Sequence, residues 1–155
     1  MKYLNKELLI YECDSSEQQR QFNKIWREQC HLLFEAQQKI RKKFPKKLWD
    51  IITDTCFHDA IIENIEISKK IKKYKPIFDI KMTMRTNENI VELYHKDVSL
   101  FKSDLWLKNS SIYFDYLYGE FLYEDGNFIH NFIAFDYCET NIICKKLNIS
   151  VRNLK

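Results

Sequence analysis

The chain has 155 residues, of which 45% are hydrophobic and 15% aromatic, so it can bury a core, and wholesale disorder is excluded. Two glycines and two prolines are too few for glycine-rich phosphate-binding loops, which excludes P-loop and Rossmann nucleotide sites. The net charge of +3 is segregated: residues 39–47 and 69–75 are basic without one acidic side chain, whereas residues 97–144 carry a balance of −6.

The sequence shows no apolar run near the roughly 20 residues that cross a bilayer, and its start lacks the apolar stretch of a signal peptide. Its five cysteines are an odd number without a Cys-x-x-Cys pair, which indicates reduced thiols rather than disulfides. We expect one cytoplasmic domain over residues 1–155, without membrane contact, cofactor or metal. The oligomeric state is not predicted.

The helical part is expected over about residues 1–55. Residues 3–12 fit a strand or a helix equally well. A capping box formed by Ser16 and Gln19 opens a long stripe of apolar residues at three- and four-residue spacing, which predicts a helix from Ser16 to Phe44. Pro45 ends that helix, and a short helix follows over residues 46–53.

The remainder, about residues 57–151, has the period of strands. Strands are predicted over 57–67, 77–85, 90–95, 112–123, 128–136 and 141–151, with a basic loop at 68–76. Residues 98–101 either continue the strand over 90–95 or form a separate strand after it. Short turns between consecutive strands predict an antiparallel meander sheet of five to seven strands, hence an α+β fold with the helices packed on the sheet.

The Asp125-Gly126 turn is the clearest hairpin in the chain and allows a register to be predicted. Tyr123 should pair with Phe128, Phe121 with His130, and Gly119 with Phe132. On the other face, the expected pairs are Glu120 with Asn131, Tyr118 with Ile133, and Tyr116 with Phe135. His130 then lies among aromatic side chains and is interpreted as a hydrogen-bonded core or rim histidine rather than a catalytic base. The face around Glu120 fits a sheet buried on both sides, or a surface for protein contact.

Three groups of residues carry a resemblance: Met1-Lys2-Tyr3 with Lys6-Glu7, Phe57-His58-Asp59-Ala60, and Tyr118 through Phe135. On these the chain resembles a small family of uncharacterised proteins from Firmicutes, most of its length being covered. The family has no assigned activity, so the resemblance implies a fold and not a function. Related small α+β proteins sit beside polymorphic toxins as immunity proteins, which is an analogy of gene neighbourhood.

His58-Asp59 is the most suggestive pair for chemistry. Neighbouring residues on a strand point to opposite faces, so we interpret the pair as a turn leading into a strand, with the carboxylate accepting from backbone N–H groups. Cys56 and His58 would share a face, as two zinc ligands must. No recognisable spacing supplies the remaining ligands, for which the candidates are His95, His130, Cys138 and Cys144.

The two basic segments, 39–47 and 69–75, are candidates for phosphate contact. In the second, the candidate residues are Lys69, Lys70, Lys72, Lys73 and Lys75, and Tyr74 could stack on a base. Lysines in a loop or at a helix end are also ordinary solvated residues that complement the helix dipole. We therefore expect only weak, non-specific nucleic-acid binding.

The function favoured by the sequence is non-enzymatic binding of another protein, a basic one, as by an immunity-type antagonist of a toxin. The acidic C-terminal sheet is the expected surface, with Asp104, Tyr118, Glu120, Glu124, Asp125 and Glu139 as candidate contacts. Nucleic-acid binding through residues 39–47 and 69–75 is the first alternative, and an enzyme of unrecognised type is the second.

Overall fold

The computed structural model describes residues 1–4, 6–9, 14–54, 57, 59–104 and 114–154. The helices in this part of the chain are α1 (Lys6–Leu9), α2 (Ser16–Ile40), the 3-10 turn η1 (Arg41–Lys43), α3 (Lys46–Asp54) and the 3-10 turn η2 (Phe135–Tyr137). The strands are β1 (Ala60–Lys72), β2 (Lys75–Arg85), β3 (Asn89–Ser103), β4 (Phe114–Glu124), β5 (Asn127–Ala134) and β6 (Cys138–Asn153). The predicted α+β class, with one long helix, a short helix and an antiparallel sheet, is confirmed. In the described residues no helix has both the length and the apolar character needed to span a membrane.

Helix α2 begins one residue earlier than a Ser16 cap would allow. Its N-cap is Ser15, whose hydroxyl accepts from the Gln18 amide at 3.2 Å, so the predicted capping box is shifted by one residue. Its regular turns stop at Ile40, and η1 completes the predicted stretch up to Pro45. Because proline has no N–H to donate, the chain turns there and α3 starts.

The strands close into a barrel in the order β1-β2-β3-β6-β5-β4, all pairs being antiparallel. It is built from two meanders, β1-β2-β3 and β4-β5-β6. Strands β3 and β6 join them over a long pairing, and a short pairing of Ala60–Ile62 with Phe114–Tyr116 closes the ring. The meanders were predicted from short turns; the closure was not, because it joins segments distant in the chain.

The β4–β5 register is confirmed down to the pair of Tyr118 with Ile133. Tyr116, however, pairs with Ala134 and not with Phe135, because a bulge lies between Tyr116 and Tyr118. Of the two alternatives for residues 98–101, the structure shows the continuation: they belong to the same strand as 90–95, β3, with an irregularity between Val98 and Leu100. One further prediction is corrected, because the expected loop at 68–76 is strand on both sides of a two-residue turn.

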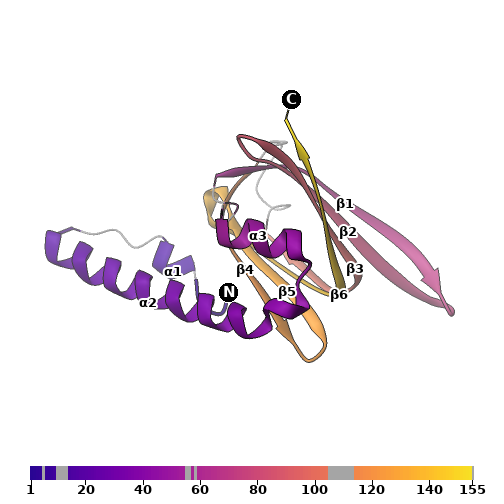
Figure 1. Ribbon diagram of the computed structural model, residues 1–155, viewed down its shortest axis with the longest axis horizontal. Coiled ribbons are helices and arrows are strands. Elements are labelled where there is room, and N and C mark those ends of the chain that lie inside the picture. Colours follow the sequence, from indigo (N-terminus) through magenta and orange to yellow (C-terminus); the bar gives the residue numbers. More distant parts are fainter. Residues whose placement is uncertain (5, 10–13, 55–56, 58, 105–113, 155) are drawn as a thin grey trace.

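The core fills the barrel and extends under α3. Side chains from the strands pack there with Leu48, Trp49 and Ile52 of α3. A smaller cluster, formed by Leu4, Leu33 and Leu122, joins the N-terminal segment and α2 to the outside of β4. In Figure 1, α2 lies on one side of the barrel, and the β1–β2 hairpin projects at the opposite end of the molecule.

Candidate functional site

The β1–β2 hairpin continues past the barrel as a two-stranded extension. Its strands pair without interruption from Ser68 with Asp79 to Lys72 with Lys75. The pairing of β2 with β3, by contrast, begins only at Phe78. Residues 69–78, which we call the finger, therefore have no third strand beside their outer part. Four residues of β1 and three of β2 lie beyond this point, and the four of β1 span ~13 Å at 3.3 Å per residue (Figure 1).

The finger gathers exposed positive charge. All five candidate lysines are exposed, and only Lys70 forms an ion pair, with Asp79. Among the described residues, no acidic side chain lies within ion-pair distance of Lys69, Lys72, Lys73 or Lys75. These four charges repel one another, so the finger offers them to an anionic partner.

The tip of the finger is a turn made by two residues that such turns disfavour. Lys73 and Tyr74 have φ of 47° and 66°, the pair of positive values that defines a type I′ turn. Side chains with a Cβ cost about 1 kcal/mol each in this conformation, which is why Asn-Gly is the usual choice. Tyr74 has no packing to offset that cost, since its side chain is 100% exposed.

Asp79 holds the base of the finger. Its carboxylate accepts from the Lys70 ammonium and, at 3.0 Å, from the Asp97 amide of β3. Partial burial opposes the charge, but the hydrogen bonds from Lys70 and Asp97 prevail and lower the pKa of Asp79. The finger is therefore tied to the barrel by an ionised group at neutral pH.

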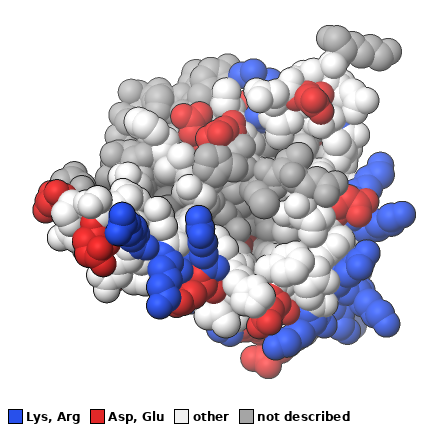
Figure 2. All heavy atoms as spheres, turned by 60° about the vertical axis from the view of Figure 1, so that its left-hand side comes forward, with Lys and Arg blue, Asp and Glu red and all other residues white. Residues whose placement is uncertain are grey.

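The other basic segment, residues 39–47, is partly engaged in packing. Arg41 lies over the Trp49 ring at 5.6 Å, and Lys43 lies over the Tyr123 ring at 5.3 Å. Basic side chains are unevenly distributed over the surface. In the view of Figure 2, Lys and Arg are concentrated along the lower right edge of the molecule, and a smaller group lies on the left.

Glu120, a predicted partner contact, is fully buried. Its carboxylate accepts from the backbone amides of Lys2, Tyr3 and Leu4 at 2.9, 2.7 and 2.6 Å, and from Asn131 Nδ2 at 3.4 Å. A buried carboxylate needs such donors, and here it fixes the N-terminal segment against the barrel. Its role is structural, and this arrangement was missed because the three backbone donors lie more than a hundred residues away.

The other acidic candidates are accessible to different degrees. Glu124 and Asp125 are exposed at the β4–β5 turn, where Glu124 pairs with Lys2 at 2.7 Å. Asp104 and Glu139 are half-buried and line a hollow of about 190 Å³, to which Lys102 adds one positive charge and Met1, Leu100, Asn131, Thr140 and Asn141 add uncharged side chains. The predicted acidic surface thus survives in two patches, without Glu120 between them.

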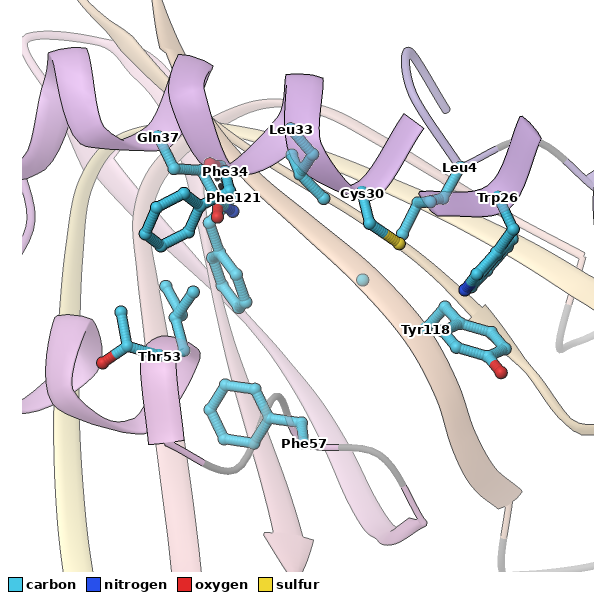
Figure 3. Close-up of a pocket in the computed structure, with 12 residues that line it drawn as sticks. Leu4, Trp26, Cys30, Leu33, Phe34, Gln37, Thr53, Phe57, Tyr118 and Phe121 are labelled. Atoms are coloured by element: carbon cyan, nitrogen blue, oxygen red, sulfur yellow. Dashed lines mark hydrogen bonds between the residues drawn. The ribbon is translucent and has the colours of Figure 1, made fainter. Parts of the chain in front are cut away.

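Tyr118 lies at a cavity between α2, α3 and β4 (Figure 3). The cavity holds about 370 Å³, and Trp26 packs edge-on against Tyr118 with 4.9 Å between ring centroids. Gln37 donates to the Phe121 carbonyl oxygen at 3.3 Å. None of the lining residues is charged: they are Leu4, Trp26, Cys30, Leu33, Phe34, Gln37, Ile52, Thr53, Phe57, Tyr118, Gly119 and Phe121. This lining suits an uncharged, apolar group and offers nothing to a phosphate.

His95, His130 and Tyr116 meet inside the barrel. His95 Nε2 lies 3.0 Å from His130 Nδ1, and the Tyr116 hydroxyl lies 3.2 Å from His130 Nε2. Burial lowers the pKa of His95 to about 4 and also lowers that of His130, so both rings are neutral at pH 7. Gly119 leaves space for the Tyr116 side chain, because a Cβ at position 119 would lie 1.5 Å from the Tyr116 hydroxyl oxygen. The interpretation of His130 as a hydrogen-bonded core histidine is confirmed.

The predicted turn before β1 is present. Asp59 lies in it, and its amide donates to the Tyr116 carbonyl oxygen at 3.1 Å. Cys56 and His58, the candidate zinc ligands, lie outside the described residues. Cys138 and Cys144 are buried and form no disulfide with a described residue, and burial raises the pKa of Cys144 to about 12. Within the described part of the chain, no three His, Cys, Asp or Glu side chains converge as metal ligands would.

No protein-family model, curated protein or solved structure matches this chain. The candidate sites are therefore judged on their geometry alone.

Proposed function

We propose that this protein binds nucleic acid through the finger. The observation that carries the proposal is a set of four exposed lysines, Lys69, Lys72, Lys73 and Lys75, which have no acidic partner in the described part of the chain and surround a fully exposed Tyr74. The sequence favoured a protein partner on the acidic sheet. Burial of Glu120 weakens that surface, whereas the extended hairpin turns the basic segment from a loop into a defined projection.

Phosphate contact explains the charge of the finger. Each lysine that meets a phosphate releases condensed counterions, which gives affinity without base specificity. Lysines on a paired hairpin keep their spacing, so they lose less backbone entropy on binding than lysines in a loop.

The turn at the tip supports the same proposal. A strained conformation persists where it serves a function, and Lys73-Tyr74 replaces the cheaper Asn-Gly with a charge and an aromatic ring. A two-stranded extension also adds little to stability, since isolated hairpins are marginal in water.

The test is a titration of fluorescently labelled RNA and DNA oligonucleotides, followed by anisotropy at several salt concentrations. One variant replaces Lys69, Lys72, Lys73 and Lys75 with Gln. We expect its affinity to fall by at least a hundredfold, and the slope of log affinity against log salt to decrease by about 3, because each lost phosphate contact removes about 0.7 for a single strand.

The matched control replaces Lys39, Lys42, Lys46 and Lys47 with Gln. It changes the net charge equally and leaves the stacked Arg41 and Lys43 in place. A small loss in this control, against a large loss in the finger variant, supports the proposal. Equal losses would assign the binding to overall charge, and no binding by the unchanged protein would refute it.

A basic protein partner is a second candidate, favoured by the hollow that Asp104 and Glu139 line. Such a patch would speed the association of a positively charged toxin, in keeping with the immunity analogy. Charge reversal at Asp104 and Glu139, with the exposed Glu88 reversed as a control, should abolish capture of a basic nuclease toxin encoded next to this gene. Capture that persists would remove this candidate.

A further inference from the structure

The two faces of the finger differ in character. Residues paired directly across the hairpin share a face, and Ile67 pairs with Ile80, a core residue. The same face therefore continues outward through Lys69 with Phe78 and Ile71 with Pro76. The opposite face carries Ser68 with Asp79, Lys70 with Ile77, and Lys72 with Lys75.

The face that continues the barrel interior is apolar yet uncovered. Ile71 is 77% exposed and Phe78 is 41% exposed, and Tyr74 is fully exposed in the turn at the tip. This face also carries Lys69, whereas the opposite face carries Lys72, Lys75 and Lys70, the last in an ion pair with Asp79. A strip of exposed apolar side chains thus lies back to back with a face on which lysines are concentrated.

We propose, on the basis of the proposed function, that the finger selects single-stranded nucleic acid. Unpaired bases stack on Tyr74 and Phe78 and cover Ile71, while the backbone of the same strand crosses to the lysines. A duplex hides its bases inside the stack, so it would engage the lysines and leave the apolar strip in water.

The same pattern fits an anionic bilayer less well. A bilayer is flat, so a finger lying with its apolar strip on the membrane would bring only Lys69 of the strand lysines to the headgroups and point Lys70, Lys72 and Lys75 away from them. A finger entering tip first would carry the charge of Lys73 into the membrane ahead of the apolar residues. A flexible single strand can reach both faces at once.

The experiment compares a 20-nucleotide single-stranded RNA, the same sequence as a blunt duplex, and phosphatidylserine vesicles as binding partners of the full chain. We expect the single strand to bind at least tenfold more tightly than the duplex. Tyr74→Ser and Ile71→Ser should each weaken single-strand binding, Tyr74→Ser by about tenfold, as expected for one lost base–aromatic stack. Tyr74→Phe, which keeps the ring, should bind the single strand as tightly as the unchanged protein.

Ile77→Ser is the matched control, because Ile77 lies on the basic face and this change should leave the preference for single strands intact. Equal affinity for single strand and duplex, with loss of both in the lysine variant, would overturn the selectivity while leaving the proposed function standing. Binding to vesicles but to neither nucleic acid would overturn both.

Discussion

The β1–β2 and β4–β5 hairpins have the same two-residue turn with positive φ at both positions, but they reach it with opposite sequences. The β4–β5 turn uses Asp125-Gly126, at φ of 49° and 76°, which that geometry favours. The β1–β2 turn uses Lys73-Tyr74, which it disfavours. The β4–β5 turn has the sequence that its geometry favours. The β1–β2 turn instead carries the side chains that the proposed partner would contact.

The strands behind the two turns follow the same division. In β4–β5, Glu120 and His130 are fully buried and hydrogen-bonded, so each residue depends on its surroundings. In the finger, Ile71, Tyr74 and the lysines are exposed, so each can be changed without disturbing the core. Mutations in β4–β5 should therefore change mainly stability, and mutations in the finger mainly binding.

The largest effect on stability is expected at Glu120. Glu120→Ala leaves one buried and two part-buried backbone amides without their acceptor, and each unsatisfied buried donor costs about 1–3 kcal/mol, so the free energy of unfolding should fall by about 4 kcal/mol. Urea denaturation measures this. Glu124→Gln, on the exposed end of the same strand, should cost less than about 0.5 kcal/mol. Similar values for the two variants would contradict the structural role of Glu120.

Acid should weaken the barrel through His95 and His130. Because burial holds their pKa values below 6.5, they stabilise the fold fully above pH 6.5. That stability is lost as pH falls from 6.5 towards about 4, and His95 alone accounts for about 3 kcal/mol.

Unfolding free energies at pH 7, 6 and 5 would show this slope. The double variant His95→Gln/His130→Gln lacks the two buried imidazoles of the barrel, so its stability should change little between pH 7 and 5. An equally steep decline in that variant would show that other groups cause the acid sensitivity.

A turn exchange tests the β4–β5 hairpin directly. Asp125→Lys/Gly126→Tyr places a Cβ-bearing residue at the φ of 76° that glycine now occupies, which should cost about 1–2 kcal/mol. Thermal unfolding measures the loss. The same exchange should add no affinity for RNA, since it supplies neither the lysine row nor the apolar strip. An increase in affinity would mean that any Lys-Tyr turn suffices.

The sequence predicted one of these hairpins and missed the other for a physical reason. Asp-Gly adopts positive φ readily, so the β4–β5 register could be derived from Tyr123 with Phe128 down to Tyr118 with Ile133. Lys-Tyr gives no such indication, and the lysine-rich segment 68–76 was interpreted as a loop. The segment nevertheless pairs as two strands, and Ile67, Ile71 and Phe78 lie on one face of that pair.

Long-range contacts set the limit of prediction elsewhere. The barrel closure, the meeting of His95 with His130, and the capture of Glu120 by the N-terminal amides each join segments far apart in the chain. Local periodicity shows which face of a strand is apolar but not which strand lies opposite. Glu120 was consequently assigned to a surface that it does not reach.

The most direct test of the central claim replaces Lys73-Tyr74 with Asn-Gly. The turn then adopts its geometry without strain, so Tm should rise by about 3 °C, which corresponds to about 1 kcal/mol for a chain of this size. Affinity for single-stranded RNA should fall by at least tenfold in the same preparation, because the ring and one charge are gone. A higher Tm with lower affinity would show that the finger sacrifices stability for binding. Unchanged affinity, or a lower Tm, would contradict this account.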